Sequence, residues 1–219
     1  MTDLVSQLIN LFAAIILMLA FAMISQRRVL ALIRLFTLQG VALVAATATV
    51  GYVTHQPHLY LSAGLTLLVK VIVIPLLLHR LIHRLDLRWD VEALINIPTT
   101  MLIGLVLVIF AFNLASPIAQ LSSTIAHGTL GIALACVLLS FLMMIVRSKA
   151  VPQVIGFLSM ENALFFAATA ATYGMPMVVE LGIALDVLVG ILISGVFLFQ
   201  IREQFDSLDI RNLEKLKEE

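Results

Sequence analysis

The chain has 219 residues, of which 62% are hydrophobic and 12% charged, and its mean hydropathy is +1.11. Soluble domains contain about 45–50% apolar residues, so this composition indicates an integral membrane protein. Lys and Arg balance Asp and Glu at 13 each, so no basic surface suggests a nucleic-acid partner. The single cysteine, Cys136, excludes an intrachain disulfide and a self-contained iron–sulfur or thiolate metal site.

Apolar runs separated by short polar segments follow one another along the chain. Each run is close to the roughly 20 residues that a helix needs to cross a bilayer, and none shows the alternation of a barrel strand. The predicted spans are Leu4–Ile24, Val29–Val53, Leu59–Leu81, Ala93–Ala115, Ile125–Val146, Val154–Thr172 and Met177–Ile201. We therefore expect an all-α integral membrane protein, with one seven-helix membrane domain over residues 1–201 and a cytoplasmic tail over residues 202–219.

The basic residues occupy alternate loops. Of the 13 Lys and Arg residues, all but Arg34 and Lys70 lie at the end of, or after, the first, third, fifth or seventh predicted span. By the positive-inside rule these segments are cytoplasmic. The sequence therefore predicts a multi-pass protein of the cytoplasmic (inner) membrane with its N-terminus outside and its C-terminus in the cytoplasm.

Apart from arginines and histidines near the span ends, four ionisable residues fall within the predicted spans, namely Lys70, Glu161, Glu180 and Asp186. Lys70 lies about 16 Å from either end of its span, and Glu161 and Asp186 lie about 12 Å from the nearer face. A charge exposed to lipid at such depth costs about 2.5–3.5 kcal/mol on insertion scales, so these groups should face one another, water or a partner subunit. Glu180 is shallower and can reach the outer interface. We expect Lys70, rather than Asp186, to be the partner of Glu161.

Buried charges of this kind have two interpretations. They form a static ion pair that holds helices together, or they carry protons, because burial and a nearby ammonium shift the proton affinity of a carboxylic acid in opposite directions. Pro75 removes a backbone hydrogen bond near Lys70 and would permit a kink or local hydration. The amides of Gln39, Asn96 and Asn162 either extend a hydrogen-bonded chain or join helices.

Five segments carry a resemblance to a known family. They are FTLQGVALVA around Gln39, LLVKVIVIPLLL around Lys70, GFLSMEN around Glu161, ELGIALDVLVGILI with Glu180 and Asp186, and SLDIRNLEKLK in the tail. In this order they resemble hydrogenase-4 component E, the HyfE-type membrane subunit of formate hydrogenlyase and related group 4 nickel–iron hydrogenase complexes. Residues from about 150 to 219 also resemble, more distantly, the K-type subunit of respiratory complex I (NuoK) and the C-type subunit of Mrp antiporters, so the last three helices are expected to be NuoK-like.

The resemblance implies a subunit without catalysis of its own in a complex I-like oxidoreductase. Its expected partners are antiporter-like membrane subunits, other membrane-arm subunits and cytoplasmic hydrogenase-like subunits. Iron–sulfur clusters and a nickel–iron centre would belong to those partners, and this chain would hold neither a metal nor a cofactor.

The resemblance also assigns roles to the buried charges. Glu161 matches the middle-helix glutamate of the NuoK type, whereas the second acid is Glu180 by local sequence and Asp186 by depth. We expect Glu161 and Asp186 to exchange protons along a hydrated midplane path that includes Gln39, with Lys70 tuning their proton affinity. The alternatives are a scaffold subunit with static ion pairs and a free-standing ion or secondary transporter.

Overall fold

The computed structural model describes residues 2–84, 94–119, 126–172 and 190, and within these residues the elements are all helices. Six of the described helical stretches are long and apolar enough to cross a membrane, so the all-helical class is confirmed and six of the seven predicted spans correspond to helices of this kind. The seventh predicted span, Met177–Ile201, and the predicted tail lie outside the described residues, apart from Gly190.

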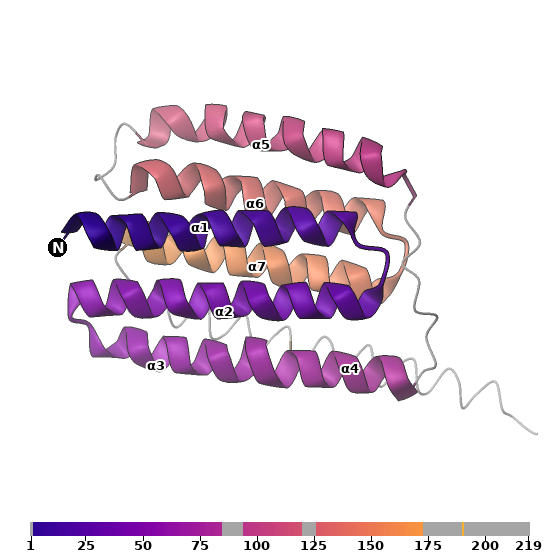
Figure 1. Ribbon diagram of the computed structural model, residues 1–219, viewed down its shortest axis with the longest axis horizontal. Coiled ribbons are helices and arrows are strands. Elements are labelled where there is room, and N and C mark those ends of the chain that lie inside the picture. Colours follow the sequence, from indigo (N-terminus) through magenta and orange to yellow (C-terminus); the bar gives the residue numbers. More distant parts are fainter. Residues whose placement is uncertain (1, 85–93, 120–125, 173–189, 191–219) are drawn as a thin grey trace, which may run out of the picture.

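The helices follow the predicted spans in chain order. They are α1 (Thr2–Ser25), α2 (Val29–Thr54), α3 (Pro57–Thr66), the π-helix η1 (Leu67–Val73), α4 (Ile74–Arg84), α5 (Ile97–Ala119), α6 (Ala126–Val146) and α7 (Ala150–Thr172). The third predicted span is thus a continuous rod built from α3, η1 and α4 (Figure 1).

Four helices form the centre of the bundle. Helix α1 packs on α2, α2 on α7, α7 on α6, and α6 returns to α1. Helix α5 lies outside this group against α6 and α1, and the rod of α3, η1 and α4 lies on the other side against α2 (Figure 1). Large apolar side chains such as Leu61, Leu102 and Ile145 remain exposed, as expected where lipid covers the protein.

Three predicted boundaries were wrong by about one turn, and the first is the start of α5, which lies at Ile97 and not at the predicted Ala93. Helix α5 continues past the predicted end at Ala115 to Ala119, and Asn113 donates its side-chain Nδ2 to the Ile109 carbonyl within the helix at 2.8 Å. Helix α7 begins ahead of the predicted Val154, because Pro152 falls in the first turn, where backbone N–H groups have no partner within the helix.

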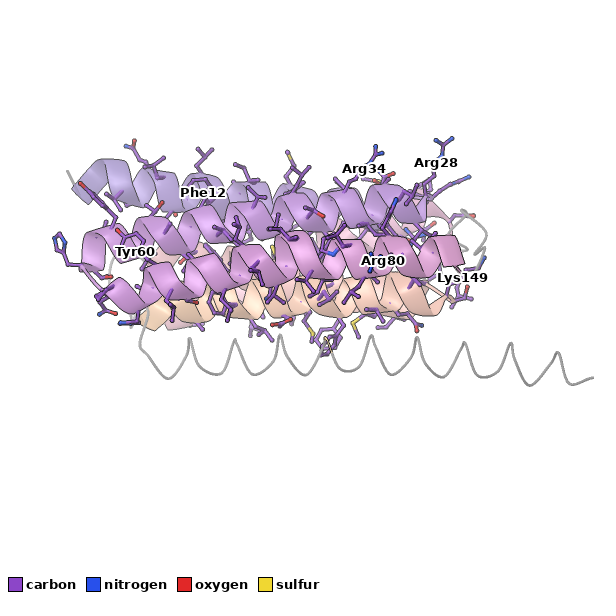
Figure 2. The ribbon with its side chains drawn as sticks, turned by 90° about the horizontal axis from the view of Figure 1, so that it is seen from below. Phe12, Arg28, Arg34, Tyr60, Arg80 and Lys149 are labelled. Atoms are coloured by element: carbon purple, nitrogen blue, oxygen red, sulfur yellow. The ribbon has the colours of Figure 1, made fainter. Side chains whose placement is uncertain are left out.

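The basic residues of the predicted cytoplasmic segments gather towards one end of the bundle. Figure 2 shows Arg28, Arg34, Arg80 and Lys149 towards the same end, and Tyr60 near the opposite end. The α1–α2 and α6–α7 connections and the end of α4 therefore share an end, as the alternation of basic loops requires. The side of the membrane that this end faces stays a prediction.

Candidate functional site

Lys70 and Glu161 form a buried ion pair halfway along their helices. The Lys70 Nζ donates to Glu161 Oε1 at 3.1 Å, and the two side chains are 1% and 3% exposed. Lys70 lies about 20 Å from either end of its rod, and Glu161 about 16 Å from either end of α7. Neither side chain is long enough to reach the membrane surface from there. The pairing is the one that we expected from the sequence.

Two buried amides adjoin the ion pair. Asn162, the residue after Glu161, donates from Nδ2 to Gln39 Oε1 of α2 at 3.2 Å, and both side chains are fully buried. The Gln39 Nε2 and Asn162 Oδ1 atoms have no hydrogen-bond partner among the described residues. We refer to Gln39, Lys70, Glu161 and Asn162 as the central cluster. It combines a carboxylate, an ammonium and amide groups that both donate and accept hydrogen bonds.

The backbone around Lys70 brings the rod close to α2. Lys70 is the middle residue of η1, and a Cβ on Gly40 of α2 would lie 3.3 Å from Val71 Cγ2 and 3.6 Å from Lys70 Cβ. Pro75 is the second residue of α4, just beyond the π-helix, and it cannot donate a backbone hydrogen bond to the preceding turn. The backbone irregularity found here is a π-helix, a feature that is frequent at functional sites, whereas the kink or local hydration that Pro75 would permit stays a prediction.

A second polar contact, which we did not anticipate from the sequence, joins α6 to α7. Ser140 Oγ donates to Ser159 Oγ at 2.9 Å, and both side chains are buried. Ser159 lies three residues before Asn162, so the two share a face of α7. This i, i+3 spacing of polar residues in an apolar run was the signal available in the sequence.

Arg147 hydrogen-bonds to carbonyl groups at the C-terminal end of α1, and it also belongs to the basic end of the bundle. Its side chain is 2% exposed, and Nη2 donates to the carbonyl oxygens of Ile24 and Gln26, each at 2.7 Å. Burial lowers the pKa of the Arg147 guanidinium, which remains charged at neutral pH because an arginine pKa is ordinarily so high. A cation at a helix C-terminus is also favoured by the helix dipole.

No family model matches this sequence, and no solved structure matches it. Over 210 residues, which are 94% of this chain and 95% of the relative, the sequence is 32% identical to the uncharacterized protein Rv0085 of Mycobacterium tuberculosis. The chain belongs to the Rv0085 family.

The similarity extends to a hydrogenase subunit. This member of the Rv0085 family is 22% identical to hydrogenase-4 component E of Escherichia coli K12 over 212 residues, which are 97% of this chain and 98% of that protein. Hydrogenase-4 component E of Shigella flexneri matches with the same identity and the same coverage. These matches support a distant relation to hydrogenase-4 component E over nearly the whole chain.

Of the five residues predicted for a proton path in this Rv0085 family member, Lys70 and Glu161 contact each other directly, and Gln39 contacts Asn162, the residue after Glu161. The other two, Glu180 and Asp186, lie outside the described residues. Within the described ranges, no group of three or more His, Cys, Asp or Glu residues is placed to hold a metal ion.

Asn96 does not join the central cluster. It is exposed immediately before α5, where its backbone carbonyl accepts hydrogen bonds from the Thr100 backbone N–H at 3.0 Å and Oγ1 at 3.1 Å. The fourth predicted span begins at Ala93 and so includes Asn96. Helix α5 instead begins at Ile97, which leaves the Asn96 side chain exposed outside the helix.

We expect Gly40→Leu to displace η1 from α2 and to destabilise the chain by about 1–3 kcal/mol, the usual cost of overpacking. Gly64→Leu is the matched control, because no atom of the described part of the chain lies within 4 Å of a Cβ at Gly64 in α3. The free energy of unfolding of both variants can be measured by SDS titration in mixed micelles. Equal stability of the two variants would contradict the close approach at Gly40.

Proposed function

We propose that this chain is a non-catalytic membrane subunit of a complex I-like hydrogenase or formate hydrogenlyase-type complex, and that its central cluster forms part of a midplane proton-translocation path. The observation that carries the proposal is the Lys70–Glu161 ion pair, buried halfway along two helices. The distant relation to hydrogenase-4 component E supports membership of a multisubunit membrane hydrogenase complex.

The chemistry of the central cluster suits transient proton binding. Glu161 holds the proton, and the ammonium of Lys70 stabilises the ionised carboxylate at 3.1 Å. A small change in the Nζ to Oε1 distance changes that stabilisation, because the interaction between charges depends strongly on distance where water is excluded. The Gln39–Asn162 pair does not titrate, and its amide groups can both donate and accept hydrogen bonds.

The remainder of the path would lie on the predicted seventh span. Asp186 is the second acid by depth, with Glu180 as the alternative by local sequence. In this proposal the last three helices are NuoK-like, the basic end of the bundle faces the cytoplasm, and the subunit connects to antiporter-like membrane subunits. Iron–sulfur and nickel–iron chemistry belongs to the partner subunits.

One observation also favours a different function. A short, fully buried ion pair between two helices that both pack against α2 is suited to a scaffold, in which Lys70 and Glu161 never change charge. In that case the protein organises its partners and conducts no protons.

We expect Glu161→Gln to abolish proton translocation by the purified complex in proteoliposomes while the complex still assembles. Glutamine has nearly the shape of glutamate and still offers an oxygen to Lys70, but it cannot bind a proton at neutral pH. Glu161→Asp, which retains a titratable group, should keep part of the translocation rate. Unchanged proton translocation in Glu161→Gln would reject the proposed path.

A further inference from the structure

One buried face of the rod changes from polar to apolar at Lys70. The end of the bundle where Tyr60 lies is called the Tyr60 end below (Figure 2). In that direction the residues four and eight positions from Lys70 are Thr66 and Ser62, which are 4% and 1% exposed. Residues four apart share a helix face, and towards the basic end the same face carries Ile74, Leu78 and Ile82, each 2% exposed or less. Lys70 therefore lies between a polar half and an apolar half of the rod.

The hydroxyl of Ser62 is bonded differently from those of the threonines in α2. Its Oγ is buried and has no hydrogen-bond partner in the part of the chain that the structure describes. The threonine hydroxyls of α2 all donate to the carbonyl four residues earlier in their own helix. A buried hydroxyl without a partner is unfavourable, so the Ser62 Oγ points to a small polar ligand such as water.

The spacing of the polar half suits a chain of single water molecules. Side chains one turn apart have Cβ atoms about 5–6 Å apart, close to the sum of two O–H···O hydrogen bonds of about 2.8 Å each. One water molecule can therefore bridge Ser62 and Thr66, and the next can join Thr66 to the central cluster. Hydroxyl groups both donate and accept, so such a chain can pass a proton in either direction.

Helix α2 contributes a third hydroxyl to the polar half. A Cβ on Gly40 would lie 3.6 Å from Lys70 Cβ. A Cβ on Gly51 would lie 3.0 Å from Leu59 Cβ, so this face of α2 packs on the rod. Thr47 lies seven residues after Gly40 and four before Gly51, and therefore shares that face. It is 1% exposed, and its oxygen can still accept a hydrogen bond.

The same face of α2 is apolar towards the basic end. Phe36 and Leu32, which are four and eight residues before Gly40, are both fully buried. We propose that Ser62, Thr66 and Thr47 line a water path that joins the central cluster to the Tyr60 end, and that the apolar half of the rod separates the cluster from the basic end in this conformation. This inference rests on the proposed proton path, and it names the side from which protons reach Glu161.

Cysteine accessibility tests the water path without any measurement of transport. Cys136, the single cysteine of the chain, is replaced by alanine, and either Thr66→Cys or Ile74→Cys is introduced into the assembled complex in membrane vesicles. The two positions are matched, because both are buried and each is four residues from Lys70. A small charged methanethiosulfonate reacts with the thiolate, which forms where water reaches the sulfur. We expect Thr66→Cys to react about tenfold faster than Ile74→Cys, or more.

A second probe and a second control guard this comparison. Ser62→Cys exchanges only oxygen for sulfur, and it should react at least as fast as Thr66→Cys. Leu67→Cys tests entry of the reagent from the lipid, because Leu67 is the next residue after Thr66 and is 41% exposed on the surface of the bundle. Leu67→Cys should react slowly, since a thiol in hydrocarbon stays protonated. Equal rates at Thr66→Cys and Ile74→Cys, or at Thr66→Cys and Leu67→Cys, would overturn the water path.

The side of access is tested by adding the reagent to vesicles of either orientation. Arg28→Cys, at an exposed position of the basic end, marks the vesicles whose basic end faces the reagent. Thr66→Cys should react in the vesicles of the opposite orientation, from the Tyr60 end. Reaction of Thr66→Cys from the same side as Arg28→Cys would contradict the proposed direction.

Removing one hydroxyl should slow transport by the intact complex. Thr66→Val keeps the shape of the side chain, and we expect proton translocation to slow about two- to tenfold, as the loss of one hydrogen bond implies. Thr66→Ser should recover most of the rate. Thr49→Val is the matched control, because the Thr49 hydroxyl already donates to the Ala45 carbonyl at 2.7 Å. Equal rates in Thr66→Val and Thr49→Val would argue against the path.

The two proposals fail in different ways. Fast labelling of Thr66→Cys from the Tyr60 end, together with unchanged proton translocation in Glu161→Gln, would reject the proton path and retain the water path. Loss of translocation in Glu161→Gln, together with equal labelling of Thr66→Cys and Ile74→Cys, would reject the water path and retain the proton path.

Discussion

Replacing Lys70 by methionine is expected to destabilise the folded chain by about 3–5 kcal/mol. The substitution keeps the apolar stem but leaves the Glu161 carboxylate, which is 3% exposed, without its ammonium partner. SDS titration of the purified chain measures the loss, and the yield of assembled complex in the membrane should fall with it. A Lys70→Met chain as stable as the wild type would show that the ion pair does not stabilise the folded protein.

The double replacement of Lys70 by methionine and Glu161 by glutamine separates the two candidate functions. Removing both charges should recover most of the lost stability, because the carboxylate of residue 161 is removed together with the ammonium that it pairs with. If Glu161 carries protons, the recovered complex still fails to translocate them. If the pair is a static scaffold, stability and translocation return together.

Arg147→Met is expected to lower the free energy of unfolding by about 3 kcal/mol or more. The guanidinium donates to the Ile24 and Gln26 carbonyl oxygens at the end of α1, and each hydrogen bond from a charged donor is worth about 1.5–3 kcal/mol. Arg147→Lys should recover only part of the loss, because an ammonium lacks the planar fork of donors.

Arg28→Met is the matched control for Arg147→Met. Both residues lie at the basic end of the bundle, but Arg28 is exposed. Its replacement should change the free energy of unfolding by about 0.5 kcal/mol or less. Equal losses from Arg28→Met and Arg147→Met would mean that the buried contacts at the end of α1 do not stabilise the fold.

The central ion pair was predictable because it depends on helical geometry alone. A rise of 1.5 Å per residue places Lys70 and Glu161 at similar depth, and the cost of a lipid-exposed charge then requires a partner. The contact between Gln39 and Asn162 was predictable only as one of two interpretations. An amide in one span can hydrogen-bond to a polar group in any neighbouring span. The sequence alone therefore does not say which amides meet, because it does not say which helices pack together.

Other features depend on tertiary packing and could not be read from the sequence. The π-helix around Lys70 forms where Pro75 interrupts the rod and Gly40 allows close approach, and Gly40 is far away in the chain. Arg147 donates a hydrogen bond to the carbonyl of Ile24 at the end of α1, although the two residues are separated by 123 positions in the sequence. In the sequence, Arg147 is indistinguishable from the exposed basic residues that set topology.

Infrared difference spectroscopy of the complex during turnover tests the central claim most directly. We expect a C=O stretching band of a protonated carboxylic acid that appears and decays with proton translocation, shifts on isotopic labelling of glutamate, and is absent in Glu161→Gln. A Glu161 carboxylate that stays ionised throughout turnover, with translocation continuing, would contradict it.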